Sequence, residues 1–106
     1  MKKAFVSLVA GLTLLGLTAT EASASNRSYR GCYFTVSGTG NTATVADYPG
    51  NCDYLQARIA IYNAPGTSYY LGTWGTNGSS RSASGTVAGR YGRVQETAYT
   101  SGWYLA

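Results

Sequence analysis

Residues 55–62 read Leu-Gln-Ala-Arg-Ile-Ala-Ile-Tyr, an alternation that decides the fold class. The odd-numbered side chains of this stretch are all apolar, whereas Gln56, Arg58 and Tyr62 occupy even positions. Because successive side chains of a strand point to opposite faces, a period of two predicts a β-strand with one face in a core. No segment beyond the first 24 residues competes with a helical period, so the sequence predicts an all-β protein.

Turn signals on both sides of this stretch divide the chain into further short strands. Residues 38–41 predict a hairpin turn, and the Pro-Gly pairs within residues 48–51 and 64–67 predict type II turns, because Gly accepts a positive φ. Asn77 and Gly78 predict a two-residue hairpin. The other expected strands are residues 32–36, 42–47, 69–76, 79–87, 91–99 and 102–105. The pattern favours a small antiparallel β-sandwich, or a partly open barrel, of six to seven strands.

The first 24 residues have the composition of an export signal. Lys2 and Lys3 precede an apolar run over residues 4–19, and Ala22-Ser23-Ala24 matches a small-x-small cleavage site. The apolar run is shorter than the ~20 residues that cross a bilayer. The sequence therefore predicts a signal peptide over residues 1–24 of bacterial type, and one secreted domain over residues 25–106 without a transmembrane anchor.

Cys32 and Cys52 are the only two cysteines. In an oxidising compartment, a disulfide between them is the expected state, and a loop of this length is stabilised by about 3 kcal/mol. The alternatives are two free thiols or a bridge between two chains. The exported segment holds only nine Val, Leu and Ile residues, so tyrosines are expected to supply core area.

Charge and composition argue against catalysis. Two of the eight basic residues and one of the four acids precede residue 25, which leaves six arginines against three acids, a net charge of +3, and no histidine. Without histidine or a spare cysteine, the common metal sites and the Ser-His-Asp and Cys-His nucleophile systems are excluded. Asp47 and Asp53 are expected to be solvated or paired with arginine. We expect a non-enzyme with no cofactor and no metal.

Aromatic and arginine side chains gather in the second half of the chain and predict a binding face. On an alternating strand Tyr70 and Trp74 would share one face, beside polar Ser, Thr and Asn side chains. The candidate binding residues are Tyr70, Trp74, Arg81, Arg90 and Trp103. The expected partner is an extracellular protein or a cell-envelope polymer, bound by a monomer. The modest charge of an exported protein does not favour nucleic acid.

The mature pattern resembles small secreted β-sandwich proteins of actinobacterial type, mostly without assigned function. The resemblance rests on Cys32 and Cys52 and on three strand motifs. The motifs are Gln56-Ala57-Arg58-Ile59, Tyr70-Leu71-Gly72-Thr73-Trp74 and Gly89-Arg90-Tyr91-Gly92-Arg93-Val94. Over the last quarter, Gly89-Arg90 and the stretch from Ala98-Tyr99 to Trp103-Tyr104 resemble lactococcin-type β-sandwich bacteriocins, which typically lack cysteine and carry histidine.

Three functional hypotheses follow. The first is a secreted, non-enzymatic module that binds a cell-wall glycan or another protein through the aromatic and arginine face. The second, implied by the bacteriocin resemblance, is an antibacterial protein. The third is an inhibitor of an extracellular hydrolase, which would present residues 64–68 or the turn near Arg81.

Overall fold

The alternating stretch forms the central strand of a computed structural model that describes residues 22–48 and 51–106. This strand, β5 (Tyr54–Asn63), buries Leu55, Ala57 and Ile59 completely and turns its even-numbered side chains to the other face. The prediction of a half-buried strand is therefore confirmed, with one extra residue at each end.

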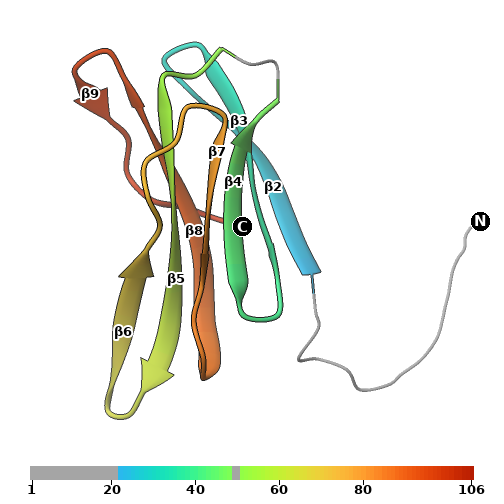
Figure 1. Ribbon diagram of the computed structural model, residues 1–106, viewed down its shortest axis with the longest axis vertical. Coiled ribbons are helices and arrows are strands. Elements are labelled where there is room, and N and C mark those ends of the chain that lie inside the picture. Colours follow the sequence, from blue (N-terminus) through green and yellow to red (C-terminus); the bar gives the residue numbers. More distant parts are fainter. Residues whose placement is uncertain (1–21, 49–50) are drawn as a thin grey trace, which may run out of the picture.

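Two antiparallel sheets pack face to face (Figure 1). The sheet built around β5 has the order β10-β8-β5-β6, with β9 paired to β8, and is called the β5 sheet below. The second sheet, called the β3 sheet, has the order β2-β3-β4-β7. The other strands are β2 (Ala22–Tyr29), β3 (Cys32–Thr39), β4 (Thr42–Asp47), β6 (Gly66–Leu71), β7 (Gly78–Ser82), β8 (Thr86–Glu96), β9 (Tyr99–Thr100) and β10 (Tyr104–Leu105). The all-β sandwich is confirmed, with nine described strands rather than six or seven.

The core lies between the sheets and is built from alternate residues of β3, β4, β5 and β8. Its largest fully buried side chains are Phe34, Val36, Val45, Leu55, Ile59 and Val94. Tyr29 and Tyr104 pack against this cluster, and the Tyr104 ring meets Phe34 edge to face at 5.5 Å. Seven of the ten tyrosines are exposed, so tyrosine supplies core area at these margins only.

Several predicted connections are confirmed. Cys32 and Cys52 form a disulfide, and β3 and β4 form the predicted hairpin, with Thr39 opposite Thr42 and Gly40 at a φ of +57°. β2 was not predicted from the sequence; it pairs with β3 through a two-residue turn. Both turn residues, Arg30 and Gly31, have positive φ, as a type I′ hairpin requires.

Two predicted turns were wrong. Asn77 and Gly78 do not join a β6–β7 hairpin, because β6 pairs with β5 and β7 pairs with β4 in the other sheet. The strand expected over residues 69–76 ends at Leu71, and residues 72–77 carry the chain from one sheet to the other. The turn before β6 has a cis Ala64–Pro65 bond and no positive φ at Gly66, so it is not of type II.

The described residues begin at Ala22, so the predicted export signal falls almost entirely outside them. The centre of the predicted turn at residues 48–51 also lies outside the described residues. Residues 22–24 pair with residues 37–39 of β3, so cleavage before Ser25 would shorten β2 to residues 25–29. In the part of the chain that the structure describes, no helix is long and apolar enough to cross a membrane.

Gly92 sets how closely the two sheets approach. A Cβ at this position would lie 2.8 Å from Val45 Cβ and 3.0 Å from a Val36 methyl carbon. Because packed cores tolerate added atoms poorly, Gly92→Ala is expected to lower the free energy of unfolding by about 1–3 kcal/mol. Urea unfolding measures this change. Gly102→Ala is the matched control, since a Cβ there meets nothing within 4 Å, and equal losses in both variants would contradict the prediction.

Candidate functional site

The outer face of the β5 sheet, directed away from the core, carries two arginines surrounded by aromatic rings. Since directly opposed residues of paired strands share a face, Arg58 lies with Tyr91, and Gln56 lies with Arg93. We call the whole group the arginine–aromatic cluster. It comprises Arg58, Arg93, Tyr69, Tyr91, Trp74 and Trp103.

Arg58 is held by three rings. Its guanidinium carbon lies 4.3 Å from the ring centroid of Tyr69, 4.4 Å from that of Tyr91 and 4.4 Å from that of Trp103. A guanidinium is attracted to the electron-rich face of a ring, with an energy of about 0.5–1 kcal/mol at exposed sites. Its Nε is buried and has no hydrogen-bond partner among the described residues. The rings thus contact the Arg58 guanidinium, and no described residue accepts a hydrogen bond from it.

Arg93 is placed by a short polar chain. Its Nε donates to Gln56 Oε1 at 2.9 Å, and Gln56 Nε2 donates to the Gly72 carbonyl at 3.0 Å. Gln56 is only 6% exposed, so these two hydrogen bonds fix the Arg93 side chain on its buried side. The guanidinium then lies between two indoles, 5.0 Å from Trp74 and 4.3 Å from Trp103.

The two arginines are close enough to repel each other. Partial burial, and then the charge of Arg58, lower the pKa of Arg93 below its ordinary value. Both guanidinium carbons lie within 4.4 Å of the same Trp103 ring centroid. Within the described ranges, no carboxylate lies at ion-pair distance from either arginine. The cluster is therefore a concentrated, uncompensated positive charge.

Backbone pairing along the edge of β5 positions Trp74. After β6 ends, the Gly72 amide donates to the Ala57 carbonyl, and Gly75 exchanges two hydrogen bonds with Leu55 at 2.8 and 2.9 Å. This pairing keeps residues 72–75 beside β5 and brings the Trp74 ring onto the outer face, over Arg93.

Trp103 is positioned by the residue that anchors its loop. Ser101 is buried, its amide donates to the Val94 carbonyl at 2.9 Å, and its hydroxyl accepts from the Val94 amide at 3.0 Å. Val94 is the neighbour of Arg93 on β8, so the anchored loop holds the Trp103 ring against both arginines.

The three acids that follow residue 24 all accept backbone N–H groups away from the cluster. Asp47 accepts from the Cys52 amide, Asp53 from the Thr97 amide, and Glu96 from the Asp53 amide. Each carboxylate thus completes a loop or strand end.

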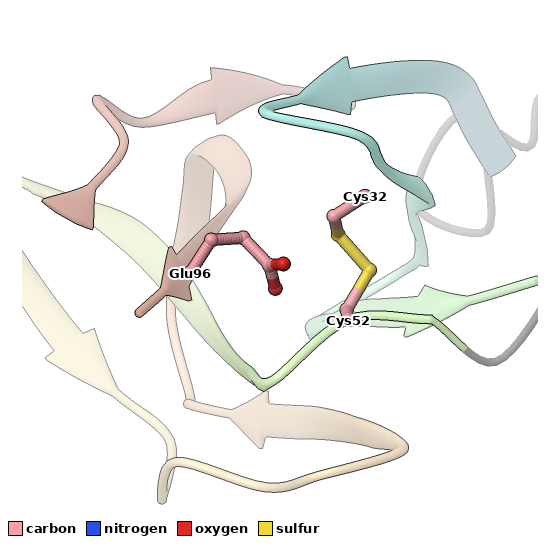
Figure 2. Close-up of side chains that lie close together, drawn as sticks. All are labelled: Cys32, Cys52 and Glu96. Carbon is pink, nitrogen blue, oxygen red and sulfur yellow. A yellow bond between two sulfur atoms is a disulfide. The ribbon is translucent and has the colours of Figure 1, made fainter. Parts of the chain in front are cut away.

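One group with the composition of a metal site lies at the disulfide. Figure 2 shows the Glu96 carboxylate pointing toward the sulfurs of Cys32 and Cys52, and the three potential ligand atoms lie within 4.8 Å of one another. The sulfurs are bonded to each other, and a metal-binding cysteine must be a thiolate. The disulfide therefore accounts for this group.

The predicted binding residues divide between three places. Trp74 and Trp103 come together in the cluster. Tyr70 lies opposite Ile59, on the core side of β6, so the expectation that it shares a face with Trp74 was wrong. Arg81 lies beside Tyr70 at the edge where β6 and β7 approach, and its guanidinium donates to the Leu71 carbonyl at 3.1 Å.

Arg90 lies on the core side of β8, opposite Ile59. Its guanidinium donates to the Gly40 carbonyl at 2.9 and 3.1 Å, and its stem lies against Gly38. These contacts tie β8 to the β3–β4 turn, so the structure places Arg90 in a connection between the two sheets, away from the cluster.

Four members of the cluster were not among the predicted binding residues: Arg58, Arg93, Tyr69 and Tyr91. The alternation of β5 already directed Arg58 to the outer face. Predicting the whole cluster would also have required the β5–β8 register, which places Arg58 opposite Tyr91.

The chain matches no protein-family model, and neither the curated proteins nor the solved structures include a match. The two family resemblances therefore stay predictions from the sequence, and the function must be argued from the site itself.

Proposed function

We propose that this protein is an exported, non-enzymatic binding module that holds a cell-envelope glycan on the outer face of its β5 sheet. The observation that carries the proposal is the arginine–aromatic cluster, in which four rings and two arginines share one face. Aromatic rings stack on the apolar faces of sugars, and guanidinium donors hydrogen-bond to sugar oxygens.

The shape of this face suits an extended ligand. Tyr54 and Tyr62 lie on β5 at either side of Arg58 and are 48% and 55% exposed. At about 3.3 Å per residue, these two tyrosines are roughly 26 Å apart along the strand. Such a strip is long enough for several sugar rings in a row, and it favours a polymer over a single monosaccharide.

The hydrolase-inhibitor alternative has less support. The disulfide joins the chain just before β5, whereas the proposed inhibitory turn at residues 64–68 follows the other end of that strand. The turn therefore lacks the covalent bracing that would hold it rigid in an enzyme's active site. The antibacterial alternative would be supported by growth inhibition of related bacteria by the purified protein.

Co-sedimentation with purified bacterial cell walls, stripped of protein by protease, tests the proposal. Trp103→Ala is expected to weaken binding at least about tenfold, because it removes the ring shared by both arginines. Tyr33→Ala is the matched control, since Tyr33 is an exposed ring on β3, 49% accessible, in the other sheet. Melting temperatures confirm that both variants fold.

Absence of wall binding by the wild type, or equal loss in Tyr33→Ala, would contradict the proposal. Binding to untreated walls that is absent from the protease-stripped walls would assign the face to a protein partner instead.

A further inference from the structure

We infer that Arg58 and Arg93 form an oxyanion site, so that the ligand of this face is an anionic glycan bearing carboxylate or phosphodiester groups. The inference rests on the proposed function and adds the charge of the ligand to it. Ring stacking alone would suffice to bind a neutral sugar. The two arginines add a preference for an anionic one.

The first step is the number of unused donors. A guanidinium has five N–H groups, all in its plane. The described residues provide no acceptor for Arg58, and they provide one for Arg93, Gln56 Oε1. Of the nitrogens of these two side chains, only Arg58 Nε is both buried and unpartnered, so the terminal nitrogens of both reach solvent. The in-plane edges of two guanidiniums are thus available to a ligand.

The second step is how the rings hold these side chains. The guanidinium carbon of Arg58 lies within 4.4 Å of the ring centroids of Tyr69, Tyr91 and Trp103, and that of Arg93 lies within 5.0 Å of those of Trp74 and Trp103. These contacts hold each guanidinium in place without supplying a hydrogen-bond acceptor. The terminal donors of both side chains therefore remain for a carboxylate or phosphate, which a guanidinium binds with two parallel hydrogen bonds.

The third step is charge. The face holds two neighbouring positive charges, and all three acids of the exported segment accept backbone amides elsewhere. Bringing like charges together costs free energy, and the pKa of Arg93 is lowered first by burial and then by the charge of Arg58. An anion between the two guanidiniums would relieve this repulsion, whereas a neutral sugar would not.

Isothermal titration of the protein, purified after expression of the full chain, with three probes tests the inference. The probes are trigalacturonate, its neutral methyl ester, and a glycerol phosphate oligomer, which separate carboxylate, uncharged and phosphodiester chemistry. We expect at least one charged probe to bind about tenfold or more tighter than the methyl ester, and its affinity to fall as salt is raised. The charged probe that binds tighter identifies the source of the anion.

Variants locate the site. Arg58→Gln and Arg93→Gln are each expected to weaken the charged probe about tenfold and leave the methyl ester within twofold. Arg30→Gln removes the same charge from an exposed arginine stacked on Tyr99, outside the cluster, and is expected to have no effect beyond twofold. Arg58→Lys keeps the charge without the planar fork and is expected to recover only part of the affinity. Melting temperatures identify any variant that fails to fold.

The failures of the two proposals are distinguishable. If the charged probes and the methyl ester bind equally and Trp103→Ala weakens both, the glycan function stands and the oxyanion site is overturned. If Arg30→Gln weakens the charged probe as much as Arg58→Gln, the binding reflects net charge and the oxyanion site is again overturned. If neither the probes nor cell walls bind, both proposals are overturned.

Discussion

Removing the Cys32–Cys52 disulfide is expected to lower the free energy of unfolding by about 3 kcal/mol. The bond closes a loop with a sequence separation of 20, which contains the whole β3–β4 hairpin. Without it, the unfolded chain gains the conformations that the closed loop forbids. For a small domain this is a large share of a total stability of about 5–15 kcal/mol.

Urea unfolding with and without a reductant measures this effect, with the double variant Cys32→Ala/Cys52→Ala as the control. Reductant should destabilise the wild type and leave the double variant unchanged. A wild-type unfolding midpoint that does not shift after complete reduction, verified by thiol labelling, would show that the loop is held by its noncovalent contacts alone.

Truncation of Phe34 is the core substitution expected to cost most. Phe34 is fully buried on β3, belongs to the central cluster and makes an edge-to-face contact with the Tyr104 ring. Phe34→Ala removes the ring and leaves a cavity, which together cost about 3–5 kcal/mol. β10 is expected to loosen with it, because this two-residue strand loses the aromatic contact that Tyr104 makes with the core.

Tyr33→Ala is the control for this substitution, because Tyr33 is the preceding residue and points to the opposite, exposed face of the same strand. It is expected to change the free energy of unfolding by no more than about 0.5 kcal/mol. Equal losses in the two variants by urea unfolding would contradict the assignment of the β3 faces.

Where the local sequence alone decides the structure, the predictions are confirmed. The alternation of residues 55–62 requires only that one face be buried, and the β3–β4 hairpin requires only its own turn. β2 was missed because its residues, ASASNRSY, contain no apolar alternation and none of them is buried. Only its pairing with β3 makes it a strand.

The connection through residues 72–77 shows why pairing partners were harder to predict. Asn77 and Gly78 favour a hairpin locally, but β6 pairs with β5, and β7 pairs with β4 at the edge of the β3 sheet. Gly75 permits the crossing, because a Cβ there would collide with the Gly78 carbonyl.

The arginine–aromatic cluster combines the two residue types that the sequence predicts for a binding face, but its members differ from the predicted residues. Trp74 and Trp103 were identified from composition. Arg58 and Arg93 lie close together because of the β5–β8 register and because the buried Gln56 holds Arg93. Neither the register nor this hydrogen bond can be derived from the local sequence. Arg90 was predicted as a binding residue, but it hydrogen-bonds to the Gly40 carbonyl. This contact could not be predicted locally, because Gly40 is 50 residues away along the chain.

The tie between β2 and β10 has a topological consequence. Ser25 Oγ donates to the Leu105 carbonyl at 2.8 Å, and Arg27 donates to the same oxygen at 3.1 Å. Residues 25 and 105 therefore lie side by side although 80 residues separate them. A polypeptide made of residues 25–106 is thus expected to close through a short linker from Ala106 to Ser25, and new termini opened at the Gly40 turn would give a circular permutant with the same sandwich.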